Sequence, residues 1–544
     1  MSRNFNDPNR RALTLHDGSL KLRTATRRRN CAADALYLGV RPFRRFPTSE
    51  KMSMFKDTMT IHTFGPGENA YGQNGGAYEG NLRKGELRGI IHINKDHCVG
   101  CDTCRKFCPT DAIKGGLGAK HEIIDDACLY CGQCLVACPF NAIEQMSFID
   151  EVERVLDAKD RIVVAQPSPA VRVSICEEFG GEPGELSTEQ MVNALEALGC
   201  VTYDCNSTAD QTIIEEGTEF VKKVQYWVLG ERGPEVDEQG KHPFPHFTSC
   251  CPGWVKYAET YAADMLPHLS TAKSPLQMGG TLAKTWAAKH ILKCDPRKVY
   301  FVSMTPCTAK IFEASRPEMN TAWRWLIEHK EIPANTPSFQ DIDASLTARD
   351  LAELFRRKGI NPLLMPKTRK RDSETHPLEV YSGAGTIFGC SGGVMEAALR
   401  TAYAVLEGHN PDPDAFQAVR GTDGRKEISA TIGGVPVRAC VASGLANARA
   451  VVEDIRAGRA QYDFVEIMAC PGGCAGGGGQ PFQEGMELAG ERGETLYEID
   501  RNNPVRFSHE NASVQKAYDD FFDKPLSHRS HELLHTDQTK WSLR

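Results

Sequence analysis

The stretch CVGCDTCRKFCPTDAI (98–113) recurs with substitutions as CLYCGQCLVACPFNAI (128–143), and this repeat decides the fold of the N-terminal part of the chain. Both copies have the spacing C-x2-C-x2-C-x3-C-P. The chain has 544 residues and 20 cysteines. In a chain of this length, cysteines grouped in this way favour metal ligation by reduced thiolates over disulfides. Two zinc sites are the alternative, but zinc sites rarely use three cysteines at this spacing with a fourth from another run.

The double run resembles the bacterial ferredoxins, in which the fourth cysteine of each run ligates the other cluster. Two 4Fe–4S clusters are therefore expected. Clusters of this kind carry single electrons, so the remaining 400 or so residues should consume or supply electrons. The expected ligands are Cys98, Cys101, Cys104 and Cys138 for the first cluster, and Cys128, Cys131, Cys134 and Cys108 for the second.

Charge is distributed unevenly along the chain. Residues 1–51 contain twelve Lys or Arg and four Asp or Glu, whereas the whole chain has a net charge of −7. A poorly ordered, solvated arm is the favoured interpretation of this basic segment, and a docking arm for an acidic partner is the alternative. The net charge argues against nucleic acid as a partner.

Neither a membrane span nor an export signal is predicted. The sequence contains no run of about 18 apolar residues. The pair Arg10-Arg11 is followed by charged residues where the apolar region of a twin-arginine signal would lie. The sequence therefore predicts a cytoplasmic protein without a transmembrane segment.

Helical and strand patterns alternate after residue 149, which predicts an α/β domain with mostly buried strands. STEQMVNALEALG (187–199) begins with a predicted capping box, and TARDLAELFRRKG (347–359) is an amphipathic helix that ends at a glycine. KVYFVSM (298–304) and DFVEIM (463–468) are strand-like runs that end just before cysteines. Ligands gather at the carboxyl ends of strands in such sheets, so these cysteines are candidates for a site.

FTSCCPGW (247–254) contains two adjacent cysteines. Successive side chains in extended chain point in opposite directions, so Cys250 and Cys251 are not expected to ligate one metal centre together. They are also poor candidates for a disulfide with each other. One thiol should face a metal centre, and the other should have a different task.

Three separated motifs carry a further resemblance. TSCCPGW (248–254), TPCTAK (305–310) and EIMACPGGCAGGGGQP (466–481) resemble the signature motifs of the iron-only (FeFe, diiron) hydrogenases, in the same order. The resemblance covers about residues 89–535. It implies an α+β and α/β multidomain protein, with a bacterial-ferredoxin-like domain and a hydrogenase catalytic domain of two α/β lobes around the H-cluster. The expected parts are a basic arm and Gly/Asn-rich lead-in (1–88), the ferredoxin-like domain (89–148), the catalytic domain (149–505) and a helical small-subunit-like segment (506–544).

The resemblance also implies the ligands of the H-cluster, a 4Fe–4S cube bridged to a diiron centre with CO, cyanide and azadithiolate ligands. The cube would be held by Cys251, Cys307, Cys470 and Cys474, with Cys474 as the bridge. The glycines around the last two cysteines would let backbone N–H groups approach such a bulky group. In the family, the position of Cys250 donates and accepts protons, a task that suits a thiol. A merely buried cysteine is the alternative.

A proton path is implied by the same resemblance. EEGTEFVKK (215–223) carries Glu216 and Glu219 on one helix face, and the family route joins such carboxylates through a serine, here Ser270. The family route ends at a basic surface residue, which corresponds to Lys223. Without the resemblance, carboxylates at this spacing are more often a solvated helix face.

Several residues are expected to contact the diiron ligands. Lys310 and the pair Pro167 and Ser168 match positions that contact cyanide, and Met468 matches a methionine beneath the diiron part, although a methionine at a strand end is otherwise most often core. Two positions depart from the family pattern. Thr305 replaces a methionine, and Leu276 replaces a glutamine, with Gln277 one place later.

The remaining cysteines receive no ligand role. Cys390 is expected near the pocket as a further thiol, and all seven are treated as structural. They are Cys31, Cys176, Cys200, Cys205, Cys294, Cys390 and Cys440.

The predicted activity is the reversible reaction 2H⁺ + 2e⁻ ⇌ H₂, with ferredoxin or other redox subunits, or a multi-subunit dehydrogenase complex, as electron partner and with maturation proteins for the diiron group. A hydrogenase-like iron–sulfur assembly factor and a hydrogen sensor are the alternatives. The segment GAGTIF (383–388) is not a complete dinucleotide-binding fingerprint. Residues 227–242 are expected to be a surface loop, and a docking loop is the alternative.

Overall fold

The structure is a computed structural model that describes residues 89–369, 374–481 and 488–538. It also describes Leu87 and the backbone of three two-residue strands, β1 (His62–Thr63), β2 (Glu68–Asn69) and β3 (Gly72–Gln73). The predicted basic arm with Cys31, and most of the loop expected at 52–88, lie outside the described residues.

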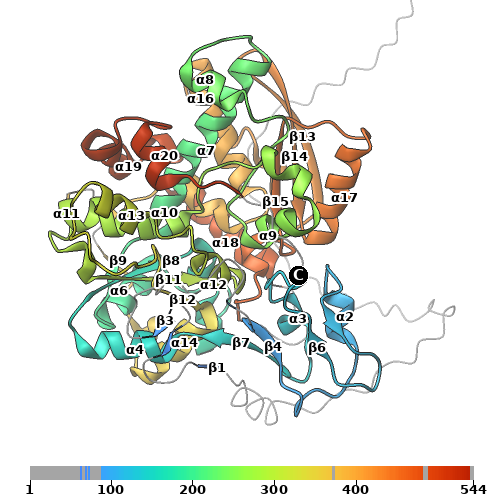
Figure 1. Ribbon diagram of the computed structural model, residues 1–544, viewed down its shortest axis with the longest axis vertical. Helices are drawn as coiled ribbons and strands as arrows, with labels where there is room; N and C mark the ends of the chain where they lie inside the picture. The colour runs from blue at the N-terminus through green and yellow to red at the C-terminus, as the bar shows by residue number, and fades with distance from the viewer. Residues whose placement is uncertain are drawn as a thin grey trace, which may run out of the picture. The chain divides into compact units, whose positions relative to one another are not determined.

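The two cysteine runs form a small unit of short elements, coloured blue in Figure 1. The first and last strands of the unit pair antiparallel, as do the two strands between them. The chain thus returns to its starting point after both runs. The elements are β4 (Ile91–Ile93), α2 (Thr103–Phe107), β5 (Ile113–Lys114), β6 (Glu122–Ile123), α3 (Gln133–Val136) and β7 (Ile143–Ser147).

The sequence repeat is also a repeat of backbone conformation. Both short helices begin directly after a residue in the left-handed region, Asp102 (φ 68°) before α2 and Gly132 (φ 73°) before α3. This conformation lets a tight loop wrap around a compact centre before the helix starts. The equivalent positions with positive φ are Gly100 and Tyr130, Asp102 and Gly132, and Asp111 and Asn141.

The first lobe of the α/β part contains a four-stranded parallel sheet in the order β12-β11-β8-β9. Every residue of β11 and β12 is buried. In Figure 1 this sheet lies between α4 and α14 below it and α10 and α13 above it, with α6 and α12 at its sides. The strands are β8 (Ile162–Pro167), β9 (Val201–Thr202), β11 (Val299–Thr305) and β12 (Ala344–Thr347). The helices are α4 (Ile149–Ala158), α6 (Thr188–Ala197), α10 (Pro275–Leu282), α12 (Ala309–Ala314), α13 (Thr321–Glu328) and α14 (Ala348–Arg357).

The second lobe contains a mixed sheet in the order β10-β15-β14-β13. The first three strands are parallel, and β13 forms an antiparallel hairpin with β14. The start of β14 alternates between buried and exposed residues, which is typical of a sheet with one solvated face. The strands are β10 (His246–Phe247), β13 (Arg425–Ile432), β14 (Val435–Ser443) and β15 (Phe464–Met468).

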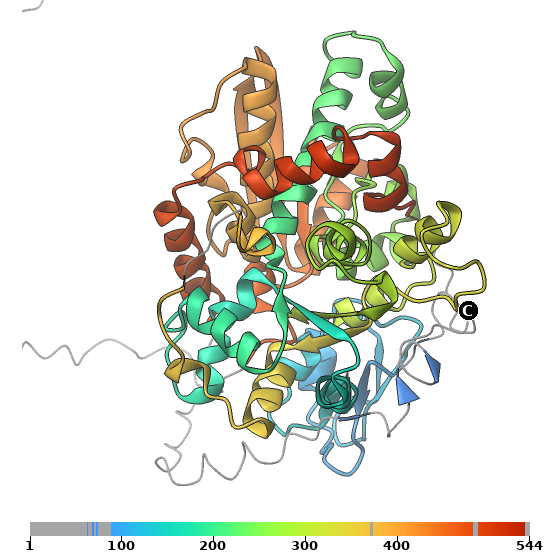
Figure 2. The same ribbon diagram turned by 90° about the vertical axis from the view of Figure 1, so that its left-hand side faces the viewer.

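Helices pack around this sheet and join the two lobes. The 23-residue helix α7 contacts both α10 and α16, and it runs through the middle of the molecule in Figure 2. α16 also packs on β13 and β15, and α17 packs on β14 and β15. The helices are α5 (Pro169–Arg172), α7 (Cys205–Trp227), α9 (Pro252–Tyr261), α11 (Ala288–His290), α15 (Gly383–Thr386), α16 (Gly393–Glu407) and α17 (Leu445–Arg456).

The C-terminal segment supplies α18 (Ala489–Asn502), α19 (Ala512–Ala517) and α20 (His528–Leu534), drawn in orange-red to dark red in Figure 1. α19 contacts α7, and α20 contacts α10 and α13. The segment therefore packs on helices that surround the site described below.

Sequence predictions of local structure are mostly confirmed. The capping box at Ser187 and Gln190 is present, and Gly359 has φ +68° just beyond α14. The predicted architecture of a ferredoxin-like domain and a two-lobed α/β catalytic domain is also confirmed. The expectation of a plain loop at 227–242 is wrong, because α8 (Pro234–Gln239) forms there after a proline suited to the first helical turn. Among the described residues, no helix has the length and apolar character that a membrane crossing requires.

Candidate active site

Two cavities in the ferredoxin-like unit are each lined by four of its cysteines. Each set combines three cysteines from one run with the fourth cysteine of the other run. The structure thus brings together both predicted sets of cluster ligands. One cavity is lined by Cys98, Cys101, Cys104 and Cys138, and the other by Cys108, Cys128, Cys131 and Cys134.

Backbone N–H groups donate hydrogen bonds to the cysteine sulfurs around these cavities. The N–H of Ala112 donates to Sγ of Cys108 at 3.2 Å, and that of Ala142 donates to Sγ of Cys138 at 3.4 Å. Hydrogen bonds of this kind stabilise thiolates and tune the potential of an iron–sulfur cluster. The residues therefore fit two 4Fe–4S clusters.

A third, larger cavity lies between the two lobes, where the carboxyl ends of strands from both sheets meet. It is lined by thiols from the turn after β10, from the end of β11 and from the loop after β15. Cys131 of the ferredoxin-like unit lines both this cavity and the neighbouring one. The cysteines on the wall are Cys131, Cys205, Cys250, Cys251, Cys307, Cys470 and Cys474.

The adjacent pair Cys250 and Cys251 separates at this wall. Cys251 is the N-cap residue of α9, and its Sγ accepts a hydrogen bond from the N–H of Ala469 at 3.3 Å. Cys250 instead packs in the apolar cluster formed by α7, α16 and the second sheet, whereas Cys251 packs in a different cluster with α9 and α17. The two thiols therefore have different surroundings.

Glycines bring the loop after β15 very close to its neighbours. A side-chain carbon at Gly477 would lie 2.3 Å from the carbonyl oxygen of Pro306. A side-chain carbon at Gly478 would lie 2.3 Å from the carbonyl oxygen of Cys131, next to the second cluster cavity. Distances below 3.0 Å exclude any residue other than glycine without a shift of the backbone. The glycine run is thus a packed wall of the cavity and not a linker.

Burial strongly affects the cavity thiols. It raises the pKa of Cys307 to about 12, and it raises the pKa of Cys470 and Cys474 well above the usual value. Several thiolates in one apolar cavity would repel one another unless cations compensated their charge. Four such cysteines with a close glycine wall fit an iron cluster, so the residues present fit the implied H-cluster.

Lys310 brings a fixed positive charge to the cavity wall. Its Nζ donates a 3.0 Å hydrogen bond to the carbonyl oxygen of Cys250 and pairs with Glu313 at 2.9 Å. Glu313 in turn accepts a hydrogen bond from Ser274 at 2.9 Å. Burial lowers the pKa of Lys310, but Glu313 more than offsets this effect, so its pKa is raised and the ammonium stays charged.

Of the five other residues predicted to contact the cofactor, three lie on the cavity wall. Ser168, Thr305 and Met468 line the cavity. The hydroxyl of Thr305 accepts a hydrogen bond from the N–H of Cys307 at 3.3 Å, which gives the polar group a local partner.

Pro167 and Gln277 are not among the residues that line the cavity, and their contact with the cofactor stays a prediction. Pro167 is the last residue of β8, and the wall begins one residue later at Ser168. Leu276 lines the cavity, whereas Gln277, the next residue of α10, points elsewhere because consecutive helical residues are about 100° apart. The buried amide of Gln277 has no hydrogen-bond partner among the described residues.

A set of buried polar residues leads away from Cys250. Glu216 of α7 is buried, and neither of its carboxylate oxygens has a hydrogen-bond partner among the described residues. Burial, together with the charge of Glu219, raises the pKa of Glu216 to about 8. The pKa of Cys250 is raised well above its usual value by burial and by the charge of Glu216, so the two groups influence each other. Oγ of Ser270 donates a 2.6 Å hydrogen bond to Oε2 of Glu219.

The expected surface position of Lys223 is wrong. Lys223 does not lie at the surface, because it is buried and its Nζ lies 2.8 Å from Nδ1 of His246. Burial lowers the pKa of Lys223 to about 8.

Cys390 lies near the cavity, next to the wall residues Gly389 and Gly473, but does not line the wall itself. Its Sγ contacts the carbonyl oxygen of Gly493 at 3.5 Å, and Phe388 and Gly389 line the wall instead.

Sequence reasoning missed two features of this region. Cys205, treated as structural, lies on the cavity wall at the first position of α7. The sequence signal for Cys205 is its position directly after Asp204, the N-cap residue of α7. His535 contacts Glu215, 320 residues earlier in the chain, and no local spacing indicates such a contact.

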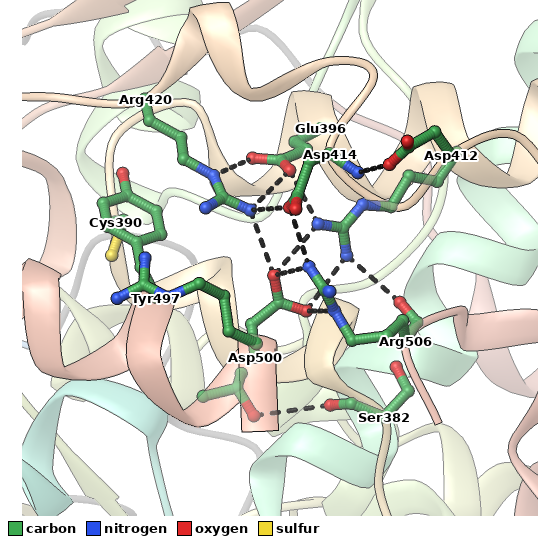
Figure 3. Close-up of polar contacts among 12 residues, drawn as sticks. Ser382, Cys390, Glu396, Asp412, Asp414, Arg420, Tyr497, Asp500 and Arg506 are labelled. Carbon is green, nitrogen blue, oxygen red and sulfur yellow. Dashed lines mark hydrogen bonds and ion pairs between the residues drawn. The ribbon is translucent and has the colours of Figure 1, made fainter. Parts of the chain in front are cut away.

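An ion-pair network anchors the C-terminal segment to α16 (Figure 3). Asp500 of α18 pairs with Arg400 at 3.0 Å and with Arg506 at 2.7 Å, and Arg400 also pairs with Glu396 at 2.6 Å. Arg420 pairs with both Glu396 and Asp500. The positive charges of three guanidinium groups thus balance the negative charges of three carboxylates that lie close together, Glu396, Asp414 and Asp500.

Fold and site together define an iron–sulfur oxidoreductase, in which two cluster sites lead to a buried cavity lined by cysteines. Three family models match the chain. They are the iron only hydrogenase large subunit, C-terminal domain (residues 161–478), the iron hydrogenase small subunit (486–541) and a 4Fe-4S dicluster domain (91–146).

Individual proteins that are similar to this chain agree with the family models. The chain is 45% identical over 409 residues to the periplasmic [Fe] hydrogenase large subunit of Nitratidesulfovibrio vulgaris, which covers 75% of this chain and 90% of that protein. A solved [FeFe]-hydrogenase structure from Chlamydomonas reinhardtii matches with a TM-score of 0.61 at 34% identity, over 73% of this chain and 99% of that one. The cytosolic iron–sulfur assembly component 3 of Mus musculus is 30% identical over 399 residues, covering 71% of this chain and 78% of that protein. The chain belongs to the iron-only hydrogenase family and is an FeFe hydrogenase with an H-cluster and ferredoxin-type 4Fe–4S clusters.

Proposed function

We propose that Cys250, Glu216, Ser270 and Glu219 carry protons for the reaction 2H⁺ + 2e⁻ ⇌ H₂ at the cysteine-lined cavity. The observation that carries this proposal is the separation of Cys250 from Cys251. Both thiols line the cavity, but Cys250 packs with residues of α7, which bears the two glutamates, whereas Cys251 packs in a separate cluster with α9.

Cys251, Cys307, Cys470 and Cys474 are the proposed ligands of the cubane, with Cys474 as the bridge to the diiron part. When bound, the H-cluster supplies the redox chemistry of iron together with a basic amine for proton exchange. Lys310, Ser168 and Met468 are the proposed contacts of the diiron ligands, and the charge of Lys310 suits an anionic ligand.

The chain's own residues exclude water and hold protons at defined atoms. The sulfur of Cys250 gives or takes a proton at the cavity, and the Glu216 carboxyl is the next carrier. The high pKa of Glu216, about 8, lets it exchange protons near neutral pH. Ser270 then passes the proton to Glu219 through their 2.6 Å hydrogen bond.

Electrons are proposed to enter through the ferredoxin-like unit. Cys131 borders both the second cluster cavity and the central cavity, which supports a short route between the two. The match to a small-subunit model indicates redox or subunit partners. Ferredoxin or a partner redox subunit is the proposed electron partner, and maturation proteins are the proposed source of the diiron group.

An iron–sulfur assembly factor is the second candidate function, because one relative carries that name at lower identity. The buried proton-carrying residues favour the hydrogenase, since an assembly factor has no evident use for them. The cytoplasmic location remains a prediction.

The test is hydrogen evolution from reduced methyl viologen by protein matured without oxygen. We expect evolution by the wild type and a loss of roughly 10²- to 10⁴-fold in Cys250→Ala with the iron content unchanged. Full turnover in Cys250→Ala would refute the proton role of this thiol.

A further inference from the structure

The C-terminal segment reaches the outer end of the proposed proton path. His535 forms an antiparallel bridge with Ala272, so residues 534–536 run beside the loop that carries Ser270. Two backbone hydrogen bonds of 2.8 Å fix this pairing, from Lys273 to the carbonyl of Leu534 and from Thr536 to that of Thr271. The backbone on both sides of His535 is therefore held against this loop.

Both ring nitrogens of His535 face groups of the path. Nε2 lies 3.1 Å from Oε2 of Glu215, and Nδ1 lies 2.8 Å from the hydroxyl of Thr271 and 3.5 Å from Oε1 of Glu219. The hydroxyl of Thr271 itself donates to Oε1 of Glu219. Nδ1–H, the threonine hydroxyl and the glutamate thus form one chain of donors and acceptors.

The electrostatic surroundings keep this imidazole protonated at neutral pH. Burial lowers the pKa of His535, but Glu215 and Glu219 more than offset this effect and raise the pKa to about 9. The other groups that face the ring are Thr271 and His531, whose ring centre lies 4.5 Å away. Glu215 also accepts hydrogen bonds from Tyr518 at 2.6 Å and from the N–H of Leu526 at 2.9 Å.

His535 is more exposed than Glu219 and Ser270, the two residues before it on the path. Its side chain is 5% exposed, compared with 1% for Glu219. His531, four residues earlier on α20, is exposed.

The rival exit runs through Lys223 and is closed. Lys223 is buried, and its hydrogen-bond partner His246 is fully buried, with no partner for Nε2 among the described residues.

We propose that His535 is the outer proton carrier of this chain, so that the C-terminal segment completes the route between Glu219 and solvent. In the inward direction, the Nδ1 proton of the imidazolium moves to Thr271 Oγ while the threonine proton moves to Glu219. The neutral ring keeps its proton on Nε2, and Nδ1 takes up a proton from water that reaches the ring on the His531 side, which restores the imidazolium. This inference rests on the proposed function, because it extends the same path.

The test compares three variants of the matured full-length protein and adds a fourth, His535→Ala, for chemical rescue. His535→Gln keeps a polar side chain of similar size but cannot carry a proton. Lys223→Gln blocks the rival exit. His528→Ala, at a position 89% exposed on the same helix, is the control. Hydrogen evolution from reduced methyl viologen is measured between pH 6 and 9, and infrared spectra check that each variant holds its cofactor.

We expect His535→Gln to lose about 100-fold in turnover, to show a larger solvent isotope effect and to retain the wild-type infrared bands. The loss in Lys223→Gln should be smaller, and His528→Ala should match the wild type. In His535→Ala, added imidazole should restore turnover, which a purely structural role would not allow. Wild-type turnover in His535→Gln, or a larger loss in Lys223→Gln, would overturn the inference and leave the proposed function intact. A wild-type protein without turnover would instead refute the proposed function itself.

Discussion

Ser270 and Glu219 are joined by a buried hydrogen bond of 2.6 Å, from Oγ of the serine to Oε2 of the glutamate. The pair connects α7 with the loop before α10, 51 residues later. The serine hydroxyl also accepts the N–H of Ala272 at 3.1 Å, which fixes its orientation. A hydroxyl held in this way can accept a proton from one side and pass its own to the carboxylate.

Ser270→Ala should therefore slow turnover by roughly 10- to 100-fold, because it interrupts the path without touching a cysteine. It should also lower the free energy of unfolding by about 1–3 kcal/mol, since Glu219 loses a buried partner. Viologen-linked hydrogen evolution and thermal unfolding check the two effects. Ser303→Ala is the matched control, because Ser303 is a buried serine that pairs with Ser345 in the first sheet. Equal loss of turnover in both variants would contradict a proton role for Ser270.

Glu216→Gln should change activity and stability in opposite directions. The pKa of Glu216 is raised to about 8, from a usual value near 4.5. Ionisation of this carboxyl therefore opposes folding, and its contribution to the free energy of unfolding falls as the pH rises from about 4.5 through 8. The amide of glutamine does not ionise, so this fall in the free energy of unfolding is absent from the variant. The variant should therefore unfold at a higher temperature than the wild type, by a margin that grows between pH 5 and 8.

Turnover of Glu216→Gln should nevertheless fall by at least about 100-fold, since an amide cannot carry a proton. Unfolding temperatures measured across this pH range without oxygen, together with hydrogen evolution, check both parts. A variant less stable than the wild type at pH 8 would show that Glu216 is ionised and paired in the folded protein.

Asp500→Ala should destabilise the protein by about 3–5 kcal/mol, because it removes one carboxylate partner from the buried guanidinium of Arg400 and from the half-buried guanidinium of Arg506. The pKa of Asp500 is lowered, since these arginines outweigh the effect of burial. Its contribution to stability is therefore present above the usual aspartate pKa and is lost as the pH falls through the lowered value. Chemical unfolding at pH 7 checks the size of the effect. Glu494→Ala is the control, because its ion pair with Arg501 is exposed and should cost at most about 1 kcal/mol.

The parts that the sequence predicts well depend on local spacing. The cysteine runs predict two sets of four cluster ligands, each with three cysteines from one run and the fourth from the other. The structure brings each set to one cavity. The strand runs that end before Cys307 and Cys470 also predict where the lobes meet, because parallel strands present their carboxyl ends on the same edge.

The parts that the sequence does not predict depend on packing between distant segments. Lys223 is buried because His246, at the start of the second sheet, lies against its ammonium group. Leu276 and Gln277 differ in direction only once α10 has begun at Pro275. His535 comes to Glu215 through a bridge with the loop at 272, and the helical pattern of the C-terminal segment does not indicate that bridge.

The most direct test of the central claim is an infrared spectrum of protein matured without oxygen, with the relative from Nitratidesulfovibrio vulgaris matured in parallel as a positive control. The claim is that Cys251, Cys307, Cys470 and Cys474 hold an H-cluster in the central cavity. It predicts bands from iron-bound CO and cyanide in the wild type, and their loss in Cys474→Ser while the two ferredoxin-type clusters remain. A wild-type spectrum without these bands, alongside a control that shows them, would contradict the claim.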